Sequence, residues 1–206
     1  ENNMKALAVK TLFTSVLFTL PTLAHAEISQ TEVSVGEVKV PSQDIAQARA
    51  LVKAFGGDLK HALMTAMKSD GPIKALTVCH VEAAPIADKN SALSSWNIAR
   101  TGMKVRNGEN APDEWEATVL RQFEQRKAAG EDLKTMEYTA VIQEGEQTIY
   151  RYMKPIATGG LCLTCHGAQV DKAVTEKVRT LYPNDQATGF TLGDIRGAFT
   201  LKKIVK

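Results

Sequence analysis

Two cysteines and one histidine, Cys162, Cys165 and His166, have the C-x-x-C-H spacing of a covalent haem attachment site. Two thiols separated by two residues can add across the two vinyl groups of one porphyrin. The histidine that follows then lies under the ring with an imidazole nitrogen aimed at the iron. The spacing therefore predicts one covalently bound haem c, with His166 as an axial ligand of the metal.

Two other interpretations of these residues remain open. Cys162, Cys165 and His166 could bind zinc if Cys79 or His80 supplied a fourth ligand. The two cysteines could instead form a redox-active disulfide, although such a pair does not need the adjacent histidine. We favour haem because covalent haem attachment in bacteria requires export, and the N-terminal residues indicate export.

The N-terminus has the features of a secretory signal peptide. Met4 and Lys5 precede an apolar run over residues 6–20, and Ala24-His25-Ala26 is a small-x-small cleavage site. We therefore expect cleavage after Ala26, which leaves residues 27–206 as one haem-binding domain in the periplasm. The alternative is an uncleaved membrane anchor, but the apolar run is at the short end for crossing a bilayer.

The charge of the mature chain argues against nucleic acid as a partner. The chain has 25 Lys and Arg and 23 Asp and Glu, and the signal peptide holds Lys5, Lys10 and Glu1. The mature balance is therefore 23 minus 22, or +1, which makes no basic surface. No second apolar span follows, so we expect no membrane association after cleavage.

Hydrophobic periodicity predicts two helices in the first half of the mature chain. Residues 42–67 place their apolar side chains on one helical face, with Ser42 as the N-cap and a kink or weakened turn at Gly56-Gly57. Asp70-Gly71-Pro72 ends this helix, and a second, short helix over residues 73–84 carries Cys79 and His80.

The rest of the chain alternates a few helices with antiparallel strands, which indicates an α+β fold. The predicted elements are a strand over 96–101, a helix over 112–129, a hairpin of 136–143 with 148–156, a helix over 170–181, and a last hairpin of 190–194 with 197–205.

Four stretches form an ordered pattern that extends beyond the haem motif. They are Val78-Cys79 with Ala84-Pro85; Arg106-Asn107 with Asn110, Pro112 and Glu116; residues 161–167; and residues 182–190 with 193–198. In these stretches the chain resembles the exported monohaem c-type proteins in which a PAS-like domain holds the haem. In that family a Cys thiolate ligates the iron opposite the motif histidine. Gly108 departs from the pattern, because the family is expected to carry Pro there.

The resemblance implies a PAS-like antiparallel sheet flanked by helices, with an N-terminal helical segment and the haem on one side. It also implies that Cys79 is the second axial ligand, which would account for a lone thiol in an oxidising compartment. His80 is the alternative ligand, and an ordinary buried role for Cys79 is the other. The haem propionates need cations, and Arg106 and Arg196 rank first because they lie in matched stretches. The other candidate cations are Arg100 and Arg151.

These residues favour a sensor of redox state or of a diatomic gas. A thiolate from Cys79 stabilises ferric iron, and its loss on reduction would open a site for CO or NO. The chain ends at Lys206, so we expect the signal to pass to a separate redox or signalling partner protein. The alternative is a low-potential electron-transfer cytochrome that keeps both ligands. Two protein ligands leave no open iron face, so we do not expect an enzyme.

Overall fold

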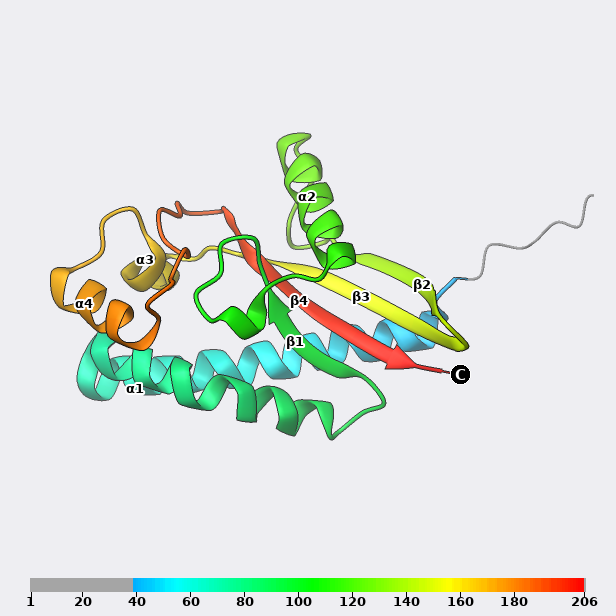
Figure 1. The fold of residues 1–206 in the computed structure, drawn as a ribbon, viewed down its shortest axis with the longest axis horizontal. Coiled ribbons are helices and arrows are strands. Elements are labelled where there is room, and N and C mark those ends of the chain that lie inside the picture. Colours follow the sequence, from blue (N-terminus) through cyan, green and yellow to red (C-terminus); the bar gives the residue numbers. More distant parts are fainter. Residues whose placement is uncertain (1–38, 206) are drawn as a thin grey trace, which may run out of the picture. The chain divides into compact units, whose positions relative to one another are not determined.

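An antiparallel sheet is the central layer of residues 39–205, the part of the chain that the computed structural model describes (Figure 1). Helices cover both of its faces, which confirms the predicted α+β class. The predicted signal peptide, residues 1–26, lies outside the described residues. The sheet has four strands in the order β1-β4-β3-β2: β1 (Asn97–Thr101), β2 (Tyr138–Glu144), β3 (Gln147–Ala157) and β4 (Ile195–Ile204).

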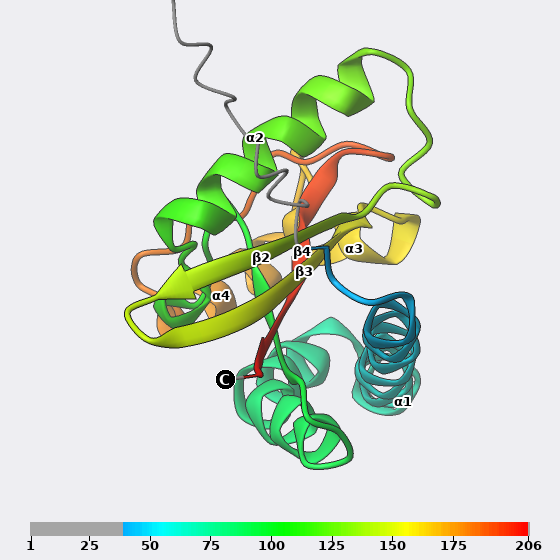
Figure 2. The same ribbon diagram turned by 90° about the vertical axis from the view of Figure 1, so that its right-hand side faces the viewer.

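Helix α1 (Ser42–Ser91) is a hairpin of two helical arms that covers one face of the sheet (Figure 2). The arms, residues 42–69 and 72–91, meet at Asp70 and Gly71, as the sequence predicts. Gly71 has φ 72° and ψ −163°, a conformation that residues with a Cβ rarely adopt. The chain can therefore reverse within two residues and bring the second arm back along the first.

Three details of α1 differ from prediction. Pro41 occupies the cap position and Ser42 makes no capping bond, so the predicted N-cap is wrong. The second arm continues through Pro85 to Ser91, beyond the predicted end at residue 84. The helix is regular at Gly56-Gly57, so the predicted kink there is also wrong.

The glycine at position 56 is explained by the close approach of the Phe199 ring and not by a need for backbone flexibility. A Cβ at Gly56 would lie 3.1 Å from Cζ of Phe199 on β4, whereas a Cβ at Gly57 would meet nothing. We expect Gly57→Ala to raise the free energy of unfolding by about 1 kcal/mol, because alanine is the better helix former. Gly56→Ala should gain less or lose stability. Urea unfolding of both variants checks this, and equal gains would contradict the packing explanation.

Two hydrophobic clusters lie on opposite faces of the sheet. The first joins α1 to the sheet through residues that include Phe55, Trp96 and Tyr152, all at most 1 % exposed. The second lies under α2 (Glu114–Ala128) and includes Phe123 and Met153. Because side chains alternate along a strand, β3 sends Tyr152 to the α1 face and Met153 to the α2 face.

A polar contact ties the first arm of α1 to β3 through Glu137. Arg49 Nε donates to Glu137 over 2.9 Å, and the Tyr152 hydroxyl donates to the same carboxylate over 2.8 Å. The hydrogen bond from Arg49 is the main cause that lowers the pKa of Glu137, and the bond from Tyr152 adds to it.

This contact predicts a pH-dependent contribution to stability. The folded-state pKa of Glu137 is depressed, so its contribution is complete above the unfolded value of about 4.3 and is lost as pH falls through the folded value. We expect Glu137→Gln to cost about 1 kcal/mol at pH 7. The difference from the wild type should shrink below about pH 4.3 in thermal unfolding followed by circular dichroism. A difference that stays constant down to pH 3 would contradict this assignment.

The predicted last hairpin is wrong. Phe190 forms only an isolated bridge with Gly167, and β4 begins at Ile195 and pairs with β1 and β3. The segment before β4 is a turn, in which the Asp194 carboxylate accepts 2.7 Å and 2.9 Å hydrogen bonds from the amide and hydroxyl of Thr191. These bonds to a side chain replace the ladder that a hairpin would need.

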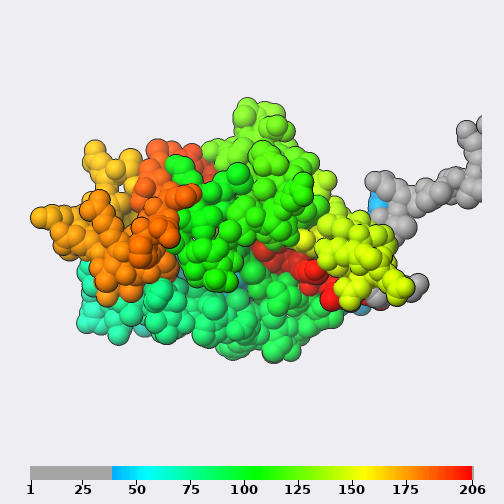
Figure 3. Space-filling model, viewed as in Figure 1, coloured from blue at the N-terminus to red at the C-terminus, as the bar shows by residue number. Residues whose placement is uncertain are grey.

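Two short helices lie at one end of the sheet, between the end of β3 and the start of β4 (Figure 1). They are α3 (Gly160–His166) and α4 (Lys172–Leu181). Leu76 in the second arm of α1 packs on Val174 and Val178 of α4. Figure 3 shows the second arm of α1 and α4 lying against each other. Among the helices that the structure describes, none combines the length and apolar character needed to cross a membrane.

Candidate cofactor site

Cys162, Cys165 and His166 lie together on α3. Both thiols are free, as is that of Cys79. Gly167 ends the helix, and a Cβ there would lie 2.6 Å from the carbonyl oxygen of Leu163. The motif is therefore followed by a residue whose backbone passes too close to the helix for a side chain.

The ring of His166 is oriented by a backbone carbonyl. Nδ1 lies 2.7 Å from the oxygen of Ala187, and because a carbonyl can only accept, Nδ1 carries the proton. The Nε of Arg196 is 3.3 Å from the same nitrogen, but two donors do not bond, so this is only a contact. The neutral ring keeps an unprotonated Nε2. An imidazole that donates from one nitrogen and offers the other is the usual arrangement of a histidine that binds a metal.

Burial and neighbouring cations keep His166 neutral. Desolvation is the main cause that lowers its pKa to about 3, and Arg196 and Arg106 lower it further. The imidazole is therefore available as a neutral electron-pair donor at any ordinary pH.

Arg106 holds the chain around α3 in place. Its Nε and Nη2 donate to the two oxygens of Asp185 over 3.0 Å and 3.1 Å, and Nη2 also reaches the carbonyls of Cys165 at 2.7 Å and Ala187 at 3.2 Å. The two charged side chains are only 9 % and 8 % exposed. One guanidinium thus fixes both the motif helix and the carbonyl that orients His166.

A β-bulge directs Arg196 toward His166. Ile156 pairs with Gly197 and Ala157 with Ile195, so Arg196 has no partner on β3. The regular alternation of side chains is broken at this bulge, and the Arg196 Nε lies 3.3 Å from His166 Nδ1. An extra residue in a strand commonly re-aims a side chain in this way next to a functional site.

Arg100 and Arg196 are cations without a carboxylate partner in residues 39–205. Burial is the main cause that lowers the pKa of each, to about 10 for Arg196, which Arg106 and Arg100 lower further. Two unpaired guanidinium groups near His166 and Cys79 suit a cofactor that carries two carboxylates. Arg151, the fourth candidate, pairs with Glu116 on the opposite face of the sheet.

Cys79 lies on the second arm of α1, one helical turn beyond Leu76, which packs near Cys165. Cys79 is an exposed residue, yet desolvation raises the pKa of its thiol more than Arg100 and Arg106 lower it. Desolvation also raises the pKa of Cys165, and Cys79 adds to that shift, so both thiols share one neighbourhood.

His80, the alternative ligand, contacts a residue that also lines the cavity beside Cys165. Its ring packs edge-on against Tyr182 at 5.0 Å between centroids. Neighbouring residues of a helix point in directions about 100° apart, so Cys79 and His80 face different parts of this region. Cys79 is the residue whose surroundings are those of Cys165 and the arginines.

A cavity of about 260 Å³ flanks α3 on the side of α4. Its walls include Arg106, Cys165, Tyr182 and Asp185. The thiol of Cys165 therefore borders open space. The zinc alternative finds no support here, because nowhere between residues 39 and 205 do three or more His, Cys, Asp or Glu side chains cluster closely enough to hold a metal ion.

Comparisons with known proteins agree with this fold. The chain is similar to a solved structure described as the crystal structure of the cyanobacterial heme-protein Tll0287, with a TM-score of 0.59 and 22% sequence identity. The alignment covers 81% of this chain and 98% of that one. A search of curated protein sequences finds no match. The family model Tll0287-like matches residues 22–203, so the chain belongs to the Tll0287-like family.

Proposed function

We propose that this chain is a periplasmic c-type haem protein with a PAS-like domain, which senses redox state or a diatomic gas. Cys162 and Cys165 would attach one haem covalently, and His166 and Cys79 would be its axial ligands. The observation that carries the proposal is the 2.7 Å contact from His166 Nδ1 to Ala187, which leaves Nε2 free to bind a metal. The solved relative is itself described as a heme-protein.

The charge of the site supports the same cofactor. Bound haem supplies an iron centre that exchanges one electron and, when a position is open, binds diatomic gases. Arg100 and Arg196, which are buried and form no ion pair within residues 39–205, would neutralise its two propionates. Arg106 pairs with Asp185 and donates to the carbonyls around α3, and its predicted contact with a propionate stays a prediction.

The two proposed iron ligands lie on different helices, and this supports sensing over electron transfer. His166 is held by a carbonyl and sits on α3, whereas Cys79 belongs to the second arm of α1. Loss of the Cys79 bond on reduction would therefore act on a different element from the one that keeps His166. A helix that changes its constraint with redox state is a suitable output toward a partner protein.

Two measurements on protein expressed with an export signal test this proposal. Haem should stay with the chain on a denaturing gel and be lost from it in the double variant Cys162→Ser/Cys165→Ser; haem that separates from the wild type would refute covalent attachment. The dithionite-reduced protein should bind CO or NO, seen as a shift of the Soret band. A reduced protein that binds neither, but exchanges electrons rapidly with a low-potential cytochrome, would establish the electron carrier instead.

A further inference from the structure

A second cavity, of about 210 Å³, lies on the face of the sheet that α2 covers, opposite α1. Asn97 and Ala99 of β1 line it, and Ile98 between them belongs to the core under α1. Thr200 and Lys202 of β4 line it in the same alternation. The cavity therefore shares no residue with the candidate haem site.

The wall of this cavity holds a buried arginine, Arg151. Arg151 is 5 % exposed, and its Nη2 donates to Asp113 over 2.9 Å and to Glu116 over 3.0 Å. Its Nε is buried with no hydrogen-bond partner. The guanidinium lies over the ring of Trp115, 4.4 Å from its centroid, which fixes its plane. Because this Nε is shielded from solvent, the donors that the guanidinium can present to the cavity are on its Nη atoms.

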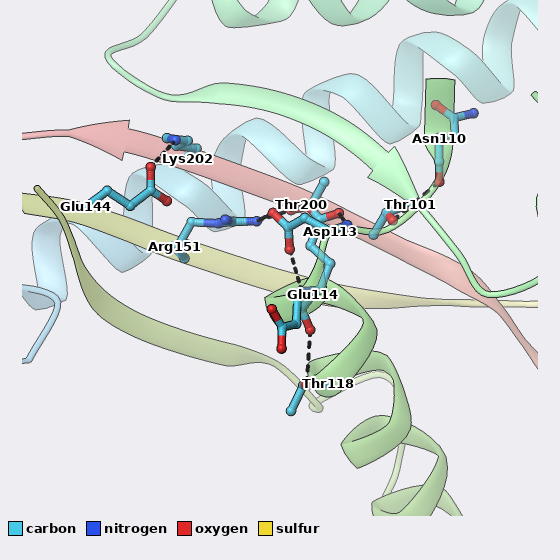
Figure 4. A network of polar contacts seen from close by, with 10 residues as sticks. Thr101, Asn110, Asp113, Glu114, Thr118, Glu144, Arg151, Thr200 and Lys202 are labelled. Carbon is cyan, nitrogen blue, oxygen red and sulfur yellow. Dashed lines mark hydrogen bonds and ion pairs between the residues drawn. The ribbon is translucent and has the colours of Figure 1, made fainter. Parts of the chain in front are cut away.

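The three carboxylates at the cavity differ in exposure and in the number of hydrogen bonds that they accept. Glu116 accepts from Thr200 at 2.6 Å, from Arg151 and from the amide of Asp113 at 3.1 Å, which uses three of its roughly four acceptor sites. Asp113 and Glu144 are about half exposed, and Glu144 pairs with Lys202 over 3.1 Å at the rim (Figure 4). The rim can thus offer both an ammonium partner and a carboxylate partner to a ligand.

We propose that this cavity binds a small zwitterion, a molecule of amino-acid size with a carboxylate and a protonated amine. Arg151 and Lys202 supply donors for the carboxylate, and Asp113 and Glu144 supply acceptors for the amine. The five charged side chains carry two positive and three negative charges, so the site disfavours a ligand that is only an anion. The volume lies below the roughly 300 Å³ at which pockets for drug-sized ligands begin, so the ligand is smaller than a drug-sized molecule.

Isothermal titration calorimetry on the purified full chain tests the ligand class. The probes are glycine, alanine and serine, each with its amide, which lacks the carboxylate, and with acetate, propionate and 3-hydroxypropionate, respectively, which lack the amine. We expect at least one amino acid to bind saturably, and its amide and acid to bind at least tenfold more weakly. No saturable heat from any amino acid would refute the proposal, and so would an amide or acid that binds as tightly as its amino acid.

Substitutions test the location of the site. Ala99→Leu adds a side chain into the cavity from β1, and Lys202→Met removes a half-exposed rim cation; each should weaken binding at least tenfold. Lys172→Met on α4, a side chain that is 91% exposed, is the matched control and should bind as the wild type does. If Ala99→Leu does not fold, Lys202→Met alone decides. An amino-acid affinity of Lys202→Met equal to that of the wild type would refute the proposed location of the site. The haem absorption spectrum of each variant reports separately on the proposed function.

Discussion

Cys79→Ala is expected to shift the ferric absorption spectrum and to raise the reduction potential by on the order of 100 mV, a part of the ~0.8 V range that axial ligands span. The thiolate is the anionic ligand in the proposed site, and its removal takes away the stabilisation of ferric iron. The same variant should bind CO more readily when reduced, because the position that Cys79 would occupy is open. Spectra and a redox titration of both proteins measure these effects.

His80→Ala is the matched control for this prediction. His80 lies next to Cys79 on the same arm but contacts Tyr182, so its loss should leave the spectrum and the potential unchanged. An unchanged spectrum in Cys79→Ala together with a changed one in His80→Ala would make His80 the ligand.

Arg106→Met is expected to destabilise the protein by about 3–5 kcal/mol, because it leaves the buried Asp185 carboxylate without its partner. It also releases the carbonyls of Cys165 and Ala187, so the orientation of His166 should become less defined. Denaturant unfolding and the width of the Soret band measure the two effects.

A double-mutant cycle separates the ion pair from the rest of this network. Asp185→Asn alone leaves Arg106 unpaired beside Arg196, which already disfavours a second cation there. The double variant should be less destabilised than the sum of the singles by about 1–3 kcal/mol. Arg121→Met, on the exposed surface of α2, is the control and should lie within about 0.5 kcal/mol of the wild type. A loss below about 1 kcal/mol in Arg106→Met would refute the anchoring role.

Most elements could be predicted from the sequence because their apolar side chains recur with helical or strand periods. The hairpin of β2 and β3 and the break at Asp70-Gly71 follow from such local signals. The error over residues 190–194 arose because a short apolar stretch does not reveal that Asp194 will bond Thr191 and close a turn. Gly56 also has a tertiary cause, the ring of Phe199, which no local pattern contains.

The candidate site was predictable only in part. The motif residues and Arg196 could be selected from the sequence, and Arg196 indeed contacts His166. The role of Ala187 could not, because a backbone carbonyl has no sequence signature. The bulge that turns Arg196 inward depends on pairing between β3 and β4. Arg100 was a candidate of lower rank, and only the fold brings it near Cys79.

The two arms of α1 differ in how firmly they are held. The first arm buries Ala48, Leu51, Val52, Phe55 and Ala66, whereas the second buries only Ala75, Leu76 and Asn90. Local opening costs least where few apolar contacts must be broken, so amide protons of the second arm should exchange with solvent through smaller fluctuations than those of the first. We therefore expect the residue proposed to leave the iron to lie on the arm of α1 that opens at the lower free-energy cost.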